Sequence, residues 1–185
     1  MNLITNGDGA TGPCETAGGI THPTGWNYNG TVTQISYNNP TYGDLSLSDP
    51  GPSNRGQCYF FGQISSTTTM WQTINLMTTV LPTLIDSQTV FFNFSAWIGG
   101  WSTQNDNAQA SLTYKDQLNQ QVGSTTTIGP VLASDRGGVS SLLFRQAQGQ
   151  VPSDARTAIV LVKFTCVDGT SNDGDIDNIS LYLYQ

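Results

Sequence analysis

Charged side chains are scarce in this chain, and one kind of acid is almost missing. Glu15 is the single glutamate among 13 acidic residues, and Lys115 and Lys163 are the only lysines. Long surface helices usually display Glu, Lys, Arg and Ala, so this composition argues against a helical protein. Serine, threonine, asparagine and glutamine take the place of charge, alongside 20 glycines and 8 prolines. We therefore expect an all-β protein with many turns.

Basic residues number only six, against a net charge of −7. No patch can neutralise a phosphate backbone, which argues against nucleic acid as a partner. The same balance argues against docking on acidic lipid headgroups. The longest apolar run, residues 158–162, is far shorter than the roughly 20 residues of a membrane span, so no membrane insertion is expected. At 185 residues, the chain is expected to form a single domain, residues 1–185.

Histidine and cysteine are also too few for most catalytic or zinc sites. His22 is the only histidine, and no Gly-x-Ser-x-Gly elbow accompanies it. Glycoside hydrolysis usually needs two carboxyl groups, one with a raised pKa, and no aspartate sits in an obviously apolar frame. Three cysteines allow one disulfide. We expect Cys14–Cys58, since both lie in Gly/Pro-rich loop sequence, and a buried thiol at Cys166.

Short alternating segments separated by turn residues are the main positive signal, and they predict roughly eight to ten strands. The turns are expected at residues 49–52, Gly99-Gly100, 136–138 and 151–154. The runs 65–69 and 124–127, rich in Ser and Thr, are interpreted as solvated loops. The clearest strands are Thr31–Tyr37, Gln57–Phe61, Met70–Leu76, Thr89–Trp97, Ala108–Asp116, Ser140–Gln146, Ala158–Cys166 and Asn178–Tyr184.

The carboxyl end combines acidic residues with a strand pattern. Asp173, Asp175 and Asp177 stand at alternate positions and lead into the apolar residues of the last strand. Clustered carboxylates repel one another unless they are solvated or bind a cation, and oxygen-only clusters suit Ca²⁺. The sequence predicts an entry turn that carries metal ligands, with a solvated acidic turn as the alternative.

A second cluster surrounds the glycine pair Gly99-Gly100. Trp97 and Trp101 flank it, and a polar run follows, formed by Asn105, Asp106 and Asn107. Tryptophan stacks on the C–H face of a sugar, and amides and carboxylates bind its hydroxyls. Trp97 continues the strand of Phe92 and Phe94, so a core position is favoured for it over a ligand-facing one. For Trp101 the two interpretations are balanced.

Three further side chains stay open. Asp106 could serve a sugar, a second Ca²⁺ or an Asx-turn. Tyr37 and Tyr42 flank Asn38-Asn39 in a loop rich in hydrogen-bonding groups, and both are candidates to line a groove.

Three segments together carry a resemblance that spans nearly the whole chain. They are residues 2–8 (Asn-Leu-Ile-Thr-Asn-Gly-Asp), Gly25-Trp26, and residues 177–181 (Asp-Asn-Ile-Ser-Leu). The set resembles carbohydrate-binding modules of the galactose-binding-like β-sandwich superfamily. The resemblance implies an antiparallel β-sandwich (jelly roll) that binds carbohydrate without altering it.

The same resemblance implies a structural Ca²⁺ where the first and last strands meet. Asp177 matches the aspartate of the family's closing motif, and Asp8 matches the polar position of the opening one. The family's glutamate two positions after Asp8 is Ala10 here, so either Asp8 or one of the loop carboxylates Asp44 and Asp49 takes the place of that ligand, or the site is weak.

We therefore expect a lectin or free-standing carbohydrate-binding module, braced by Ca²⁺ that could also reach the sugar. The alternative from another class is a structural or adhesive module that binds protein or itself, and a glycoside-active enzyme is the weaker rival. No signal peptide is visible, yet the resemblance implies an extracellular protein, with an intracellular one left open. A homo-oligomer also stays open.

Overall fold

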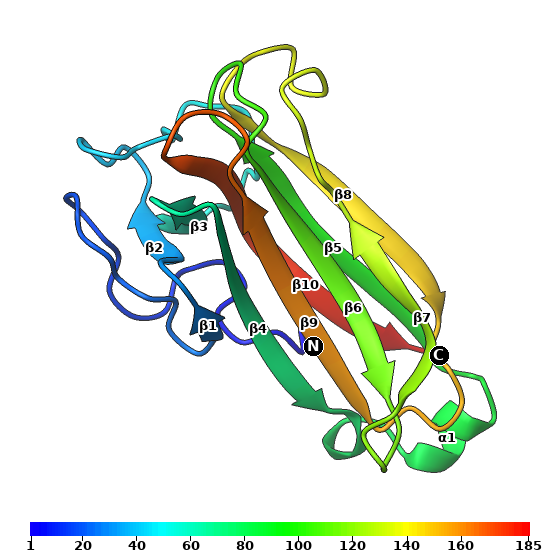
Figure 1. Cartoon of the computed structure of the whole chain (residues 1–185). Helices are drawn as coiled ribbons and strands as arrows, with labels where there is room; N and C mark the ends of the chain where they lie inside the picture. The colour runs from blue at the N-terminus through cyan, green and yellow to red at the C-terminus, as the bar shows by residue number, and fades with distance from the viewer.

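The computed structural model describes residues 1–185 and shows two antiparallel β-sheets packed face to face (Figure 1). One sheet has the order β1-β4-β9-β6-β7 and the other β2-β3-β10-β5-β8. No helix has the length and apolar character needed to cross a membrane. The elements are β1 (Asn27–Asn29), β2 (Thr33–Ser36), β3 (Cys58–Gln63), β4 (Thr67–Asn75), the 3-10 helix η1 (Leu76–Thr78), α1 (Pro82–Asp86), β5 (Phe91–Gly100), β6 (Asn107–Lys115), β7 (Gln121–Ile128), β8 (Ser141–Gln150), β9 (Thr157–Thr165) and β10 (Asn172–Tyr184).

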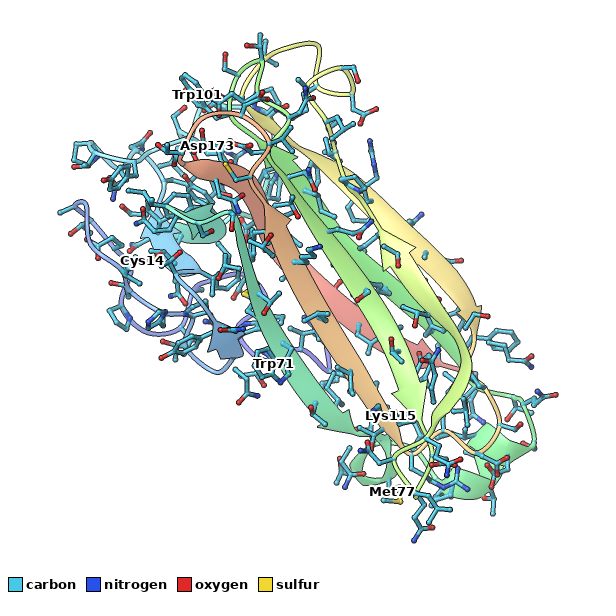
Figure 2. All side chains as sticks on the ribbon, in the orientation of Figure 1. Cys14, Trp71, Met77, Trp101, Lys115 and Asp173 are labelled. Atoms are coloured by element: carbon cyan, nitrogen blue, oxygen red, sulfur yellow. A yellow bond between two sulfur atoms is a disulfide. The ribbon has the colours of Figure 1, made fainter.

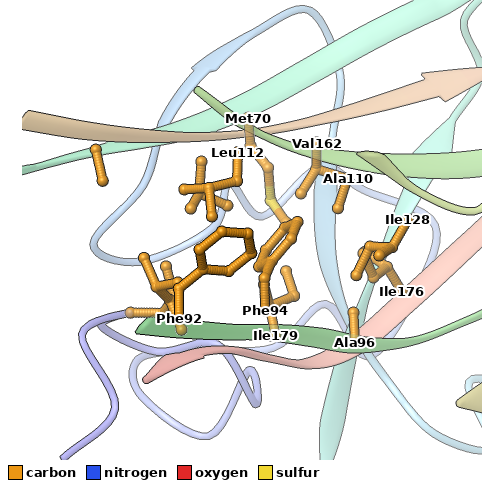
Figure 3. Close-up of a cluster of buried hydrophobic side chains, with 14 of the residues drawn as sticks. Met70, Phe92, Phe94, Ala96, Ala110, Leu112, Ile128, Val162, Ile176 and Ile179 are labelled. Carbon is orange, nitrogen blue, oxygen red and sulfur yellow. The ribbon is translucent and has the colours of Figure 1, made fainter. Parts of the chain in front are cut away.

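The core lies between the two sheets because apolar residues recur at every second position of the central strands. In β5 the inward side chains include Phe92, Phe94 and Ala96, and they are buried. Met70 of β4 and Val162 of β9 approach them from the other sheet (Figure 3). Burying each large apolar side chain stabilises the fold by about 1.5–3 kcal/mol, so this layer supplies most of the driving force.

A second, smaller apolar cluster lies on the opposite side of the second sheet. It forms where the segment between β2 and β3, residues 37–57, folds back over the outer face of that sheet. Its buried members are Ile35, Tyr37, Leu45, Tyr59, Phe61 and Leu142. The segment therefore covers part of the outer face, around Tyr59 and Phe61, and Trp97 packs against the edge of this cluster.

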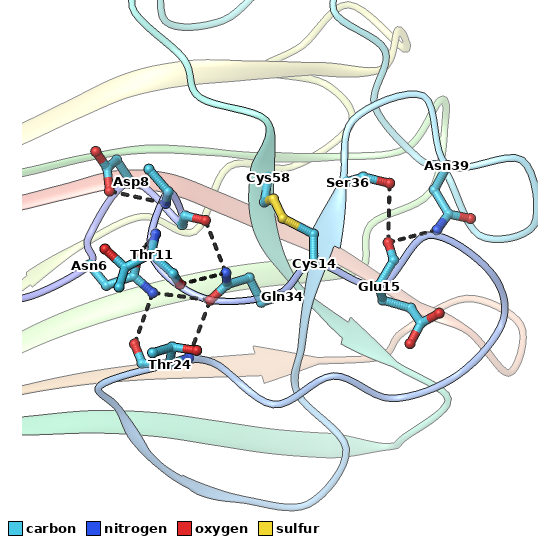
Figure 4. The surroundings of a disulfide bond; sticks show 12 residues. Asn6, Asp8, Thr11, Cys14, Glu15, Thr24, Gln34, Ser36, Asn39 and Cys58 are labelled. Carbon is cyan, nitrogen blue, oxygen red and sulfur yellow. Dashed lines mark hydrogen bonds between the residues drawn. A yellow bond between two sulfur atoms is a disulfide. The ribbon is translucent and has the colours of Figure 1, made fainter.

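The amino-terminal segment runs beside β10. The amide of Leu3 donates to the carbonyl of Leu181, and the amide of Ile179 donates to the carbonyl of Gly7. The two ends of the chain thus meet side by side, as expected from the opening and closing motifs. Beyond this contact, Cys14 forms a disulfide with Cys58 at the start of β3 (Figure 4).

Hydrogen bonds from Gln34 of β2 fasten the same amino-terminal loop. Its side-chain amide donates to the carbonyls of Gly9 and Thr11, and its oxygen accepts from the Asn6 side chain (Figure 4). The predicted disulfide is confirmed, and the loop it anchors is held by buried polar contacts as well as by the covalent bond.

The all-β sandwich is confirmed, and each of the eight expected strands overlaps an observed one, but four local predictions are wrong. Of the Ser/Thr run 65–69, residues 67–69 begin β4 and Thr68 is buried, because β4 pairs with β9 from its first residue. The Ser/Thr run 124–127 lies inside β7, an edge strand whose exposure removes the apolar alternation that would mark it. Gly99 and Gly100 continue β5 and form no turn. Glycine is needed there for close strand approach, because a Cβ on Gly99 would overlap the Ser141 carbonyl of β8. The thiol of Cys166 is half-buried rather than buried.

Candidate functional site

The part of the second sheet that residues 37–57 leave uncovered forms a groove on its outer face. Strand alternation turns Ser95 and Trp97 of β5 outward, while their neighbours face the core. Register then places Phe144 of β8 beside Trp97 and Ser180 of β10 beside Ser95, with Tyr182 one step further along β10. Together these side chains form the floor of a groove of about 410 Å³.

The amino-terminal segment forms one wall of the groove. Asn2 fixes the position of this segment. The side-chain oxygen of Asn2 accepts from the amides of Ile4 and Leu181, and its side-chain nitrogen donates to the carbonyl of Ile179. Gly7 is required here because a Cβ would overlap the Ile179 carbonyl. The segment contributes Asn2, Ile4, Asn6, Gly7 and Asp8 to the lining.

A further part of the rim comes from the segment between β2 and β3 and from a bulge in β10. Asn178 stands where the β10–β5 register shifts, with φ +48°, and its side chain donates to the Asn54 side chain at 3.1 Å. Both asparagines line the groove. The rim therefore presents amide groups to whatever occupies the floor.

Three aromatic side chains, Trp97, Phe144 and Tyr182, make the floor of the groove partly apolar. Trp97 and Phe144 pack with ring centroids 5.6 Å apart at 55°. Phe144 and Tyr182 are 45% and 44% exposed, and Trp97 is half-buried. Exposed aromatic faces beside amides and hydroxyls can stack on apolar C–H surfaces and bind polar groups at their edge.

Trp97 is the one sugar-binding candidate from the sequence that lines this groove. The prediction that Trp97 lies in the core is wrong. Trp97 is an odd number of residues away from Phe92 and Phe94 along β5, so its side chain points to the outer face of the sheet. Sequence reasoning missed Phe144 and Tyr182. Tyr182 had a usable signal, because it faces away from Ile179 and Leu181 in the alternation of the last strand.

The other candidates lie at the end of the sandwich or beneath the covering segment. Trp101 is 43% exposed in the loop that follows β5, at the same end as Asp173 (Figure 2). Asn105 is exposed beside it, and its amide donates to Asp168. Asn107 begins β6, and its side chain donates to the Asn105 carbonyl. None of these three lines the groove.

Asp106, Tyr37 and Tyr42 are occupied by contacts within the protein. Asp106 is fully buried and accepts from the amides of Val167, Asp168 and Asp173, so it joins the β9–β10 connection to β6. Tyr42 packs against the smaller apolar cluster. Tyr37 is buried, and its hydroxyl donates to Asp177 Oδ2 at 2.6 Å.

The expected calcium position at Asp177 and Asp8 offers few free oxygens. Burial is the main cause that raises the pKa of Asp177 to about 7, and hydrogen bonds from Tyr37 and the Asn178 amide oppose it. Its two oxygens are each used by one of these donors. Asp8 is exposed and accepts from the Ala10 amide. These residues do not fit the ligand set that the resemblance implies.

The remaining metal candidates are placed differently from the expectation. Asp173, Asp175 and Asp177 lie within β10 itself, not in an entry turn, because β10 begins pairing with β3 at Asn172. Asp49 accepts from the amide and hydroxyl of Ser46 and only closes a turn. As the side chains stand, no group of three or more His, Cys, Asp or Glu is arranged to hold a metal ion.

Comparison with known proteins gives a likeness at the level of structure. No family model matches the sequence, and no curated protein matches it. The enzymatically active domain of tailspike protein 4 from bacteriophage CBA120 superimposes with a TM-score of 0.59 at 15% identity, over 99% of this chain and 21% of that one. This chain therefore spans about a fifth of the tailspike chain.

A module called TmCBM61, solved in complex with β-1,4-galactotriose, superimposes with a TM-score of 0.51 at 13% identity, over 100% of this chain and 99% of that one. At these identities the likeness concerns the fold. The two antiparallel sheets, their topology and this full-length correspondence lead to one conclusion. The chain has the β-sandwich fold of a carbohydrate-binding module.

Proposed function

We propose that this chain binds carbohydrate without altering it, in the groove on the outer face of the β2-β3-β10-β5-β8 sheet. The observation that carries the proposal is the floor of Trp97, Phe144 and Tyr182 between amide-bearing rims. The bound galactotriose of TmCBM61 adds support, because that module shares the fold over the full length of this chain.

The chemistry of the lining suits a neutral sugar. Aromatic faces cover the apolar C–H side of a pyranose, and the side chains of Asn54 and Asn178 supply donors and acceptors for its hydroxyls. A volume of about 410 Å³ falls within the range of small-molecule sites. Association with a neutral ligand also agrees with the scarcity of charge in the whole chain.

The lining also supports binding rather than hydrolysis. Asp8 is the one carboxylate among the 13 residues that line the groove. Glycoside hydrolysis usually employs two carboxyl groups about 5–9.5 Å apart on either side of the scissile bond. A groove with one exposed carboxylate can hold a sugar by its hydroxyls and has no partner for acid–base catalysis.

An extracellular location belongs to the same proposal. Disulfides persist in oxidising compartments and are rare in reducing ones, and the Cys14–Cys58 bond fits the first setting.

The test is a polysaccharide and oligosaccharide screen, followed by calorimetric titration of any ligand that binds. Trp97→Ala should weaken binding at least about tenfold, because a stacked aromatic side chain contributes roughly 1.5–3 kcal/mol. Trp71→Ala is the matched control, since Trp71 is half-buried on the other sheet, away from the groove (Figure 2).

Two results would count against the proposal. Absence of binding to every neutral glycan in a broad screen would reject the function. Binding that survives Trp97→Ala but is lost in Trp101→Ala would move the site to the loops at the end of the sandwich.

A further inference from the structure

Two carboxylates at one end of the sandwich, one fully buried and one with a buried oxygen, lack the hydrogen bonds that buried charges require. Asp175 is fully buried, and neither of its oxygens has a partner. Asp44, on the segment between β2 and β3, has a buried Oδ2 that is also unpaired. Buried polar atoms are almost always paired, and an ionised carboxylate without a partner is especially costly. Either bound protons or a bound cation must therefore offset these charges.

The unpaired carboxylates belong to one acidic cluster. The pKa of Asp175 is raised by burial first and then by Asp44 and Asp173. The pKa of Asp44 is raised by burial first and then by Asp173 and Asp106. Four carboxylates therefore repel one another within a largely buried region.

Arg136 is the one cation that acts on this cluster. It lowers the pKa of Asp175, but its guanidinium donates elsewhere, to the carbonyls of Ser102, Gln104 and Val139. The two terminal nitrogens of this guanidinium are committed to backbone carbonyls, and its buried Nε has no partner, so one cation leaves most of the negative charge uncompensated.

The side chain of Gln104 gives a second, independent indication. Its amide oxygen faces two carboxylates, 2.6 Å from Asp173 Oδ2 and 3.1 Å from Asp106 Oδ2. Oxygens at such separations repel unless a proton or a cation lies between them. If the amide is turned over, its nitrogen donates to both carboxylates instead. The two orientations make opposite predictions, and these can be measured.

We propose that Asp44, Asp173 and Asp175, together with the Gln104 amide oxygen, hold a divalent cation. Carboxylate and amide oxygens without nitrogen or sulfur are the donor set of Ca²⁺. As the side chains stand, no three of the acidic residues are arranged to hold a metal ion, so binding must bring their carboxylates closer together.

This site is separate from the Asp177 and Asp8 position, where each Asp177 oxygen already has a donor. It joins three segments that are distant in sequence: the one between β2 and β3, the loop after β5, and the start of β10. The ion would stabilise the fold whether or not a sugar is bound, so its test does not depend on the proposed carbohydrate function.

The experiment is calorimetric titration of chelator-treated full-length protein with CaCl₂, up to about 10 mM, which exceeds the dissociation constants of weak extracellular calcium sites. We expect one ion per chain. The melting temperature should rise by about 5–10 °C when Ca²⁺ reaches 100 times its dissociation constant. Tb³⁺ in place of Ca²⁺ should show luminescence sensitised by Tyr59, which lies close enough to Asp44 and Asp175 for both to raise its pKa.

Variants locate the ion. Asp175→Asn and Asp44→Asn should each weaken Ca²⁺ binding at least tenfold, and Asp175→Asn should raise the melting temperature of the chelated protein by removing an unpaired charge. Asp44→Asn lies outside the strands, so it keeps the test decisive if Asp175→Asn fails to fold. Asp177→Asn is the matched control and should leave Ca²⁺ affinity unchanged.

Substitutions of Gln104 distinguish a cation bound by its amide oxygen from a hydrogen bond donated by its amide nitrogen. Gln104→Glu should tighten Ca²⁺ binding if the oxygen is a ligand, whereas Gln104→Ala should weaken it. The proposal is overturned by no Ca²⁺ binding in the titrated range. It is equally overturned if Asp177→Asn abolishes binding while Asp175→Asn retains it, or if Gln104→Glu weakens binding.

Discussion

Removing the Cys14–Cys58 disulfide should lower the free energy of unfolding by an amount set mainly by the unfolded chain. The two cysteines are 44 positions apart. In the chain-entropy treatment, closing a loop of this length restricts the unfolded ensemble by about 4 kcal/mol at 25 °C. With an unfolding entropy of about 2.1 cal/mol/K per residue over 185 residues, the melting temperature should fall by roughly 10 °C.

The folded state should change little when the bond is lost. The amide of Glu15 still donates to the Gln34 carbonyl, and the amide of Ser36 still donates to the Glu15 carbonyl. Asn39 adds a further bond to Glu15 from its side chain (Figure 4). The loop therefore keeps its place in the folded state, and stability is lost because the unfolded chain gains conformational entropy.

Urea denaturation followed by tryptophan fluorescence provides the assay. Cys14→Ala, Cys58→Ala and the double variant should lose similar amounts, because each removes the same bond, with about 1 kcal/mol extra for the buried Cys58. Cys166→Ala is the control and should cost less than about 1 kcal/mol, since Cys166 is unpaired and half-buried. Additive losses in the double variant, or a reductant that leaves the wild-type midpoint unchanged, would refute the reasoning.

Two further substitutions test the contacts around β10. Tyr37→Phe removes the hydroxyl that donates to buried Asp177, so urea unfolding should show a loss of about 1.5–3 kcal/mol, the range for hydrogen bonds to charged groups. Gly7→Ala places a Cβ against the Ile179 carbonyl, which should separate the amino-terminal segment from β10. Hydrogen exchange should then show lost protection of the Ile179 amide, with about 2 kcal/mol or more of destabilisation.

Each of these has a control of the same chemistry. Tyr28→Phe removes a hydroxyl from a side chain that is 44% exposed, and should change stability by less than about 0.5 kcal/mol. Gly56→Ala meets no atom closer than 3.5 Å and should be equally mild. If either control matched its partner variant, the contact assigned to Tyr37 or Gly7 would not be the cause.

Local pattern predicted much of the fold because the sandwich core depends on alternation. Strands such as β5 and β9 carry large apolar residues at every second position, which a sequence displays directly. The sequence did not predict β7, because an exposed edge strand needs no apolar face and so shows no apolar alternation. The turn predicted at Gly99 and Gly100 is wrong because glycine is common both in turns and where two strands approach closely. Only the neighbouring strand, which the sequence does not show, distinguishes these two cases.

The site was less accessible to sequence reasoning because it is assembled across strands. Trp97 joins Phe144 through the β5–β8 register and Tyr182 through the β5–β10 sheet, and no single segment shows all three. Likewise, the Tyr37–Asp177 contact spans 140 positions. Residue types predicted sugar and calcium chemistry, but parity and register decide which side chains share a surface.

The position of β10 constrains how the protein can be made. The final strand lies between β3 and β5, and the amino-terminal segment also bonds to it. Until β10 has left the ribosome, β3 and β5 have no neighbour between them, and the amino-terminal segment has no strand to bind. The nascent chain must therefore keep two strand edges unpaired until β10 has emerged, so completion of the sandwich depends on contacts of long sequence separation, which slow folding.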